Sequence, residues 1–89
     1  MHETSQSPLS ILRRKRVENE TGLSRSTIYA RIKEGLWPKP VCIGPRSVGW
    51  LASEVQAMNA ARVAGRTNDQ IRQLVAALER ARATVDDRG

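Results

Sequence analysis

Residues that commonly build catalytic and metal sites are scarce in this chain. It has one histidine, His2, in a polar N-terminal tail, and one cysteine, Cys42. A single cysteine forms neither an internal disulfide nor a cysteine-based zinc site, and we expect Cys42 to be a small buried residue on a strand. The carboxylates are scattered and there is no glycine-rich phosphate loop. The sequence therefore predicts a protein that is not an enzyme and uses no metal or cofactor.

Apolar residues are also limited. Phenylalanine is absent and the aromatic residues are Tyr29, Trp37 and Trp50, so a core must be built mainly from leucine, isoleucine and valine. No apolar run approaches the roughly 20 residues of a membrane-spanning helix, and the N-terminus lacks a signal-peptide pattern. For a chain of 89 residues we expect one small cytoplasmic domain without membrane contact.

Positive charge is concentrated in one part of the chain. The net charge is +6, and residues 13–46 hold nine basic and three acidic side chains, which accounts for the whole excess. Residues 67–89 carry four of each sign. A basic excess confined to one half is typical of proteins that bind a polyanion such as nucleic acid. The alternative is a basic protein that is merely soluble.

The first half of the chain predicts a helix-turn-helix. The basic run R-R-K-R (13–16) opens a first helix, and Gly22 and Leu23 form a turn. Ser24 is suited to cap a second helix over residues 25–34, because its hydroxyl can accept a bond from an unpaired amide of the first turn. Two helices joined by so short a turn form a helix-turn-helix.

The second helix has an apolar face and a polar face. Ile28 and Ile32 are four residues apart and are expected to face the core. The opposite face is small or hydroxylated, which suits entry into the major groove of DNA. The alternative is an ordinary amphipathic helix with a solvated basic face. The predicted groove-reading residues are Arg25, Ser26, Thr27, Tyr29, Ala30 and Lys33.

A β-hairpin is predicted after the second helix. Pro38 and Pro40 exclude a helix, and the apolar segments 41–43 and 48–50 flank a turn with Arg46 at its tip. A hairpin in this position would be a wing beside the groove-reading helix. Basic residues around these elements are predicted to contact DNA phosphates, with a solvated surface as the alternative. These residues are Arg14, Lys15, Arg16, Arg31, Lys39 and Arg46.

Two more helices are predicted, over residues 51–65 and from Thr67 or Asn68 onward. The last helix carries an apolar seam whose residues step by three and four. The seam either docks on its own domain or offers a surface to another copy, since left exposed it would be an unusual apolar patch. We predict weak head-to-tail association through the seam that becomes cooperative on DNA. The seam residues are Ile71, Leu74, Leu78, Ala81 and Val85.

Three segments follow from these patterns. Residues 1–10 are expected to be a disordered tail, although Leu9, Ile11 and Leu12 can begin an extended segment that packs on the core. Residues 11–66 are expected to form a winged helix-turn-helix domain, and residues 67–89 a C-terminal helix that serves oligomerisation. The predicted fold class is mainly α with a small β-hairpin.

The chain resembles the AlpA family of phage and prophage regulators, which are small MerR-like winged-helix proteins. The resemblance covers about residues 11–66, although Met58 stands where the family often has tryptophan. It implies DNA binding without catalysis, with Arg25, Ser26, Thr27, Tyr29 and Lys33 reading the groove and Arg46 on the wing. The matching blocks are T-G-L-S-R-S-T-I-Y (21–29), E-G (34–35), W-P-K-P-V (37–41), I-G-P-R-S-V-G-W (43–50) and S-E-V (53–55).

The family resemblance leaves two roles open. Its members regulate transcription in mobile elements or act as excisionases, which bind repeated sites beside an attachment site and bias a tyrosine integrase toward excision. We favour an excisionase, because the chain shows no ligand-sensing domain and its extra helix could join neighbours on adjacent sites. A transcriptional regulator is the alternative, and a protein–protein adaptor is a third reading that the basic half disfavours. The expected partners are double-stranded DNA, further copies of the chain and a tyrosine integrase, at the bacterial nucleoid.

Overall fold

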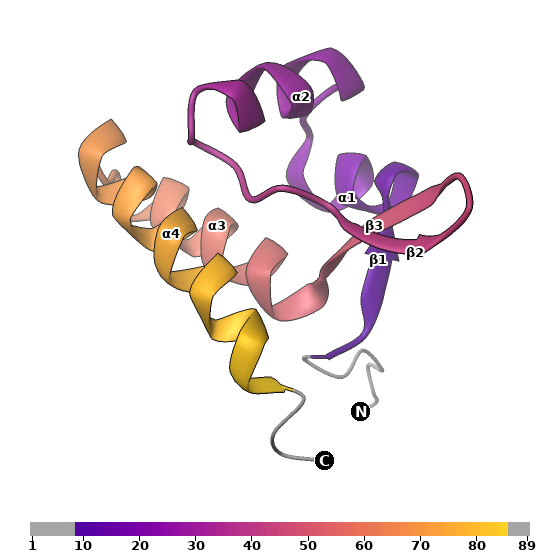
Figure 1. The fold of residues 1–89 in the computed structure, drawn as a ribbon. Coiled ribbons are helices and arrows are strands. Elements are labelled where there is room, and N and C mark those ends of the chain that lie inside the picture. Colours follow the sequence, from indigo (N-terminus) through magenta and orange to yellow (C-terminus); the bar gives the residue numbers. More distant parts are fainter. Residues whose placement is uncertain (1–8, 86–89) are drawn as a thin grey trace, which may run out of the picture.

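A small antiparallel sheet lies at one side of four helices in the part of the chain that the structure describes (Figure 1). The computed structural model describes residues 9–85, without the side chain of Val85. The order of elements confirms a winged helix-turn-helix fold with an added C-terminal helix. The elements are β1 (Ile11–Arg13), α1 (Arg14–Thr21), α2 (Arg25–Lys33), β2 (Val41–Gly44), β3 (Ser47–Leu51), α3 (Ala52–Val63) and α4 (Asn68–Val85).

The two helices of the helix-turn-helix lie where the sequence predicts, except that α1 begins one residue later, at Arg14, and α2 ends one residue earlier, at Lys33. Gly22 and Gly35 follow α1 and α2 with φ angles of 74° and 76°, a left-handed conformation that glycine adopts without a Cβ clash. The Ser24 hydroxyl accepts a hydrogen bond from the Thr27 N–H at 3.2 Å, so Ser24 is the N-cap of α2. These local signals set the short turn between α1 and α2.

The sheet has the order β1-β3-β2, with both pairs antiparallel. Strands β2 and β3 form the predicted wing, and the extended segment expected near Ile11 is confirmed as β1, which pairs with β3. The prediction that Cys42 is buried is wrong, because Cys42 is exposed. Strand β2 has a neighbour on one side only, and both Cys42 and Ile43 face solvent there.

The core lies between the sheet and the helices. Val17 of α1, Ile28 of α2 and Trp50 of β3 are fully buried, so both helices of the helix-turn-helix and the wing contribute to the core. Met58, which stands where the family often has tryptophan, is 4% exposed and belongs to the core. The buried core cluster comprises Leu12, Val17, Ile28, Trp37, Trp50, Ala52, Val55, Met58 and Val75.

Helix α4 docks on its own domain. Val75 belongs to the core cluster, and Ile71, Leu74 and Leu78 are partly buried against it. Packing within the chain removes part of the apolar area of these three seam residues from water, so contact with another copy loses its main support and stays a prediction. Ala81 is exposed. Of the two alternatives for the seam, docking on the same chain is the one found in the structure.

Some predictions fall outside the described residues. The proposed disordered tail lies there up to residue 8, together with His2. The seam position of Val85 has a described backbone only, and residues 86–89 are not described. Ser10 is described, and its carbonyl accepts a hydrogen bond from the Ala52 N–H at 2.8 Å, so the end of the segment assigned to the tail is tied to the start of α3.

Candidate nucleic-acid interface

Helix α2 turns its polar side to solvent. Ile28 is fully buried and Ile32 packs against the core, which sets the rotation of the helix. Short side chains dominate the middle of the outward side, so another molecule could approach the α2 backbone closely. Its exposed residues are Arg25, Ser26, Tyr29, Ala30 and Lys33.

Two predicted groove-reading residues interact with neighbours on α2. The Arg25 guanidinium lies 6.0 Å from the centroid of the Tyr29 ring, at the outer limit of a cation–π contact. Thr27 is half-buried, and its hydroxyl accepts a hydrogen bond from the Ser24 hydroxyl at 3.0 Å. The structure thus places Thr27 in the cap of α2, beside the outward face rather than at its centre.

The basic run that opens α1 is partly paired. Arg14 forms an ion pair with Glu18, and Arg16 forms one with Glu20 at 3.0 Å, each four residues along the helix. Lys15 lies between them, exposed and without a carboxylate partner among the described residues. The Arg16–Glu20 pair is exposed, whereas the Arg14–Glu18 pair is partly buried. Exposed ion pairs contribute little stability, so Arg16 can exchange its carboxylate for a phosphate at low cost.

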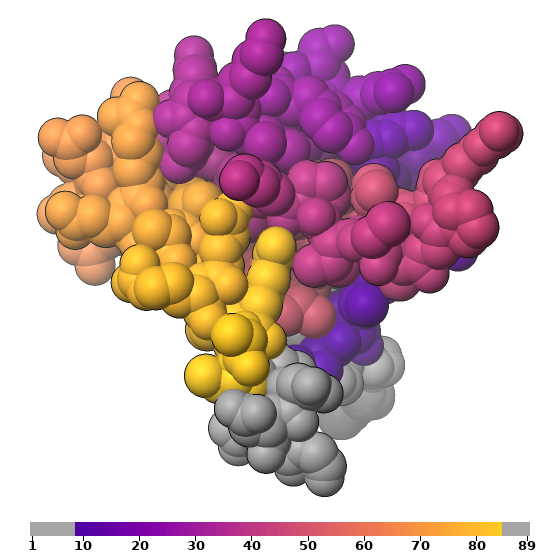
Figure 2. Space-filling model, in the orientation of Figure 1, coloured from indigo at the N-terminus to yellow at the C-terminus, as the bar shows by residue number. Residues whose placement is uncertain are grey.

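The wing and the start of α1 share one basic hollow. Arg46, in the turn between β2 and β3, lines it together with Arg13, Arg14 and Lys15. Figure 2 shows the wing projecting at one edge of the molecule, beside the surface formed by α2. Arg13, the first residue of the R-R-K-R run that the sequence places in the helix, joins Arg14 and Lys15 in this hollow. In the structure Arg13 ends β1.

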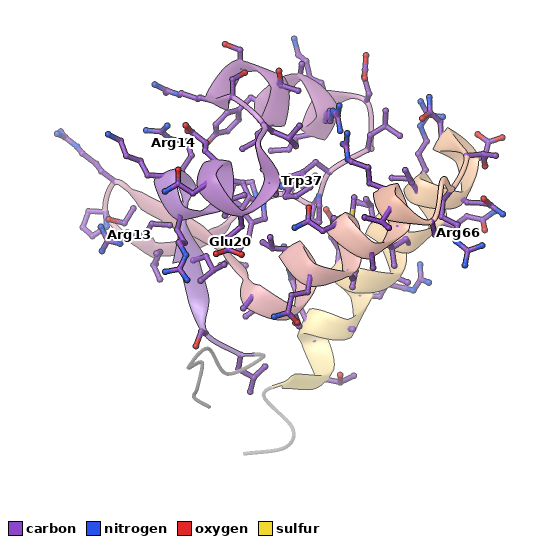
Figure 3. The ribbon with its side chains drawn as sticks, turned by 180° about the vertical axis from the view of Figure 1, so that it is seen from behind. Arg13, Arg14, Glu20, Trp37 and Arg66 are labelled. Carbon is purple, nitrogen blue, oxygen red and sulfur yellow. The ribbon has the colours of Figure 1, made fainter. Side chains whose placement is uncertain are left out.

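A second group of arginines lies at the other end of α2. Arg31 lines a hollow together with Arg62 and Arg66, which come from the end of α3 and the turn before α4. Figure 3 shows Arg66 and Arg13 on opposite sides of the molecule. Arg62 and Arg66 were missed by sequence reasoning because they lie about thirty positions beyond Arg31, with no pattern joining them.

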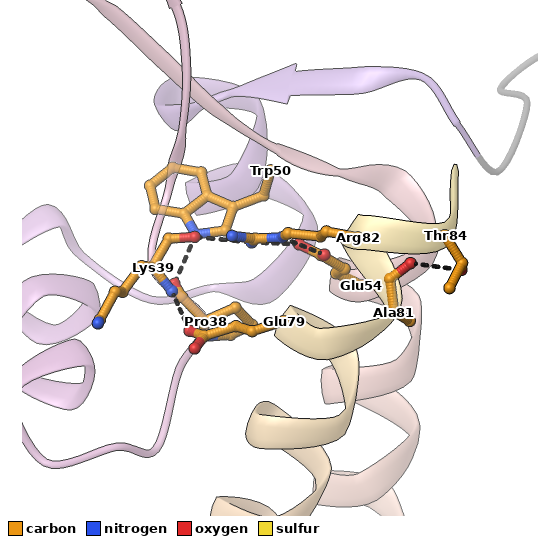
Figure 4. A network of polar contacts seen from close by, with 8 residues as sticks. All are labelled: Pro38, Lys39, Trp50, Glu54, Glu79, Ala81, Arg82 and Thr84. Atoms are coloured by element: carbon orange, nitrogen blue, oxygen red, sulfur yellow. Dashed lines mark hydrogen bonds and ion pairs between the residues drawn. The ribbon is translucent and has the colours of Figure 1, made fainter. Parts of the chain in front are cut away.

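Lys39 is exposed, while its backbone is held by α4 (Figure 4). The Lys39 N–H donates to the Glu79 carboxylate at 2.8 Å, and its carbonyl accepts from the Arg82 guanidinium at 2.7 Å. The side chain of Lys39 remains available to a phosphate. The sequence carried no signal for these contacts, which join residues about forty positions apart.

Arg82 is anchored by a buried carboxylate. Its guanidinium donates to both carboxylate oxygens of Glu54, at 2.7 and 2.8 Å, and Glu54 is 2% exposed. The hydrogen bond to Glu54 raises the pKa of Arg82 above its ordinary value, with burial opposing the shift and the charges of Glu54 and Glu79 adding to it.

Side chains that commonly bind metal ions do not cluster in residues 9–85. No group of three or more histidine, cysteine, aspartate or glutamate side chains is placed there to hold a metal ion. None of the helices in residues 9–85 has the length and apolar character needed to cross a membrane.

Comparison with known proteins identifies the family. The family described as "Prophage CP4-57 regulatory protein (AlpA)" matches residues 10–62. "Uncharacterized protein ORF88" of Enterobacteria phage P4 is 56% identical over 45 residues, which are 51% of this chain and 51% of that protein. The chain thus spans about half the length of this relative, and no solved structure matches. Because the family match runs through β1, the helix-turn-helix, the wing and nearly all of α3, the chain belongs to the AlpA family of prophage regulatory proteins.

Proposed function

We propose that this protein binds double-stranded DNA sequence-specifically, with α2 in the major groove. The observation that carries the proposal is the outward face of α2, where Ser26, Ala30 and Lys33 are exposed on the side opposite the buried Ile28 and Arg25 is exposed at the edge of that face. A helix fits the major groove, where arginine and serine can bond base edges and small residues allow close approach. Ala30 is such a small residue on this face.

Phosphate contacts would hold α2 in register. The hollow lined by Arg13, Lys15 and Arg46 is suited to one backbone strand, because cations from the wing and from α1 converge there. Arg31 is suited to the backbone at the other end of α2. Such contacts supply sequence-independent affinity, and the base contacts of α2 supply specificity.

The biological role supported by family membership is regulation of a phage or prophage. Within that role we propose an excisionase that binds repeated sites near an attachment site and biases a tyrosine integrase toward excision. The docking of α4 on its own domain removes one argument for this role, namely a free helix that joins neighbouring copies. The family's description as regulatory favours the second candidate, a regulator of the element's transcription.

A matched pair of variants tests DNA binding by α2. Ala30→Glu places a carboxylate on the exposed face of α2, and Ala77→Glu makes the same change at an exposed position of α4. We expect Ala30→Glu to abolish duplex binding in a gel-shift assay and Ala77→Glu to bind nearly as well as the wild type. Equal binding by both variants, with unchanged unfolding midpoints, would remove α2 from the interface.

A nuclease footprint over the element's attachment region and promoters separates the two roles. Protection of spaced repeats beside the attachment site supports excision, whereas protection of one promoter-centred site supports control of transcription. A protein–protein adaptor would give no salt-dependent protection of either region.

A further inference from the structure

Side chains of helix α4 form hydrogen bonds with residues 34–40, the connector that joins α2 to the wing. Arg72 donates from Nε to the Glu34 carbonyl at 2.9 Å, directly after α2 ends. Glu79 accepts the Lys39 N–H, and Arg82 donates to the Lys39 carbonyl, just before β2 begins. Three side chains of one helix thus bond backbone groups at both ends of residues 34–40.

The chemistry of the connector makes these bonds hard to replace. Pro38 and Pro40 have no N–H, so Lys39 supplies the one amide donor of the Pro-Lys-Pro stretch. The Pro38 carbonyl accepts a hydrogen bond from the indole N–H of Trp50 at 2.8 Å (Figure 4). The backbone polar groups here are therefore satisfied by side chains of β3 and α4 rather than by regular secondary structure.

Helix α4, which bonds the connector, is itself held to the core. Arg82 holds the buried Glu54 through two hydrogen bonds, and Glu54 lies in the first turn of α3. Val75, on the same helix as Arg82, is 5% exposed and packs within the core cluster. Helix α4 therefore cannot shift along the domain without breaking both apolar packing and this ion pair.

We propose that α4 sets the position of α2 relative to the wing, with Arg72, Glu79 and Arg82 acting as positioning residues that do not themselves touch DNA. Helix α4 lies beyond residues 10–62, the part matched by the family, so this device is an addition to the matched domain. The consequence for DNA affinity rests on the proposed function, whereas the positioning itself can be measured without DNA.

Positioning matters because α2 and the wing must meet the same duplex at once. If the two elements sample several relative positions, only the competent fraction binds, and the apparent dissociation constant rises by the reciprocal of that fraction. A rigid connector keeps the competent fraction high. Loosening it to a competent fraction of about one tenth would weaken binding about tenfold.

The test variant is Arg72→Ala combined with Glu79→Ala. It removes one charge of each sign, so the net charge of the chain is unchanged, and it leaves Arg82 in place so that the buried Glu54 stays paired. Arg80→Ala is the control, since Arg80 is exposed on the same helix and has no bonding partner among the described residues. Glu79→Gln is the conservative variant, because an amide oxygen can still accept the Lys39 N–H.

The direct readout is the distance between α2 and the wing in the full chain without DNA. Spin labels on Cys42, an exposed residue of β2, and on Ala30→Cys report that distance by pulsed electron resonance. We expect the distance distribution to broaden in the double variant and to stay narrow in Arg80→Ala and Glu79→Gln. A merely stabilising role for α4 would lower the unfolding midpoint and leave the distribution of the folded protein unchanged.

The DNA readout uses chains without the label. We expect the double variant to bind a specific site about tenfold more weakly, with an unchanged slope of affinity against salt. An unchanged distance distribution would overturn the proposal, as would a salt slope reduced by about one, because it would show that Arg72 contacts a phosphate. If the double variant does not fold, Arg72→Ala alone carries the same two measurements. A wild-type chain that binds no duplex would overturn the proposed function, and the distances would still decide whether α4 positions α2.

Discussion

Some cationic side chains of this protein form ion pairs within the chain, and others do not. Arg14, Arg16, Arg72 and Arg82 form ion pairs in the described part of the protein. Arg25 has no ion-pair partner among the described residues, and its guanidinium lies 6.0 Å from the centroid of the Tyr29 ring. A free guanidinium reaches DNA without first breaking a bond, so Arg25 and the wing arginine are the side chains from which we expect the largest effects.

The first prediction at this scale is that Arg25→Ala weakens binding to a specific site. If Arg25 bonds a guanine through two hydrogen bonds, the loss is about 1–3 kcal/mol and random DNA is much less affected. Quantitative gel shifts on specific and random duplexes measure both losses. Equal weakening on the two duplexes, with a salt slope reduced by about one, assigns Arg25 to a phosphate instead. Unchanged affinity on every sequence excludes it from the interface.

Arg46→Ala tests the wing. Arg46 is exposed in a turn, so the substitution should change the free energy of unfolding by less than about 0.5 kcal/mol. DNA affinity should fall on specific and random sequences alike, because the wing faces the backbone. Thermal unfolding and gel shifts on the same preparation check the two statements together. A large drop in the unfolding midpoint with intact binding would make Arg46 a structural residue.

At the scale of an element, the rotation of α2 decides which residues read DNA. Ile28 is fully buried and its neighbour Tyr29 is 38% exposed. Ile28→Ala should cost about 2–5 kcal/mol of stability through lost burial and a cavity, which is a large part of the stability of a small domain. Tyr29→Ala, the matched change one position on, should lower stability less and DNA affinity more. Chemical denaturation of both variants gives the two free energies of unfolding. A larger loss in Tyr29→Ala than in Ile28→Ala would show that Tyr29, not Ile28, faces the core.

Helix α4 gives a prediction that differs from the one made on sequence alone. Leu74 and Leu78 pack against the core, so changing both to serine, or ending the chain after Arg66, should unfold the domain rather than only abolish cooperative binding. Ala81→Ser is the control, because Ala81 is exposed on the same helix. Circular dichroism measures whether each variant keeps its helical structure. If the truncated protein folds and binds single DNA sites, α4 would again be predicted to link neighbouring copies of the protein.

For the whole molecule, the net charge of +6 and its placement govern association with DNA. If cations of α1, α2 and the wing contact one duplex, binding should weaken linearly in a plot of log affinity against log salt concentration. Each phosphate contact adds about −0.9 to the slope, and contacts by Lys15, Arg31 and Arg46 would give a slope near −3 under the same relation. A slope near zero on duplex DNA would contradict the proposed interface.

The part of this protein determined by sequence alone is the part whose causes are local. Glycines with left-handed geometry end α1 and α2, Ser24 caps α2, and prolines exclude helix before the wing. These signals act within four residues of one another, so the helix-turn-helix, the wing and the buried face of α2 follow from the printed sequence. The exposed face of α2 follows as well, because helical periodicity assigns its residues once Ile28 is inward.

The tertiary structure alone decided what distant residues do to one another. A seam with three- and four-residue steps is equally suited to its own domain or to another copy, and only the fold shows Leu74 and Leu78 meeting the core. The strand order exposes Cys42 at an edge, which alternation along one strand cannot reveal. The pair of Glu54 and Arg82 spans 28 positions. Each of these depends on which surfaces pack together, and that is set by the burial of the whole chain rather than by any local pattern.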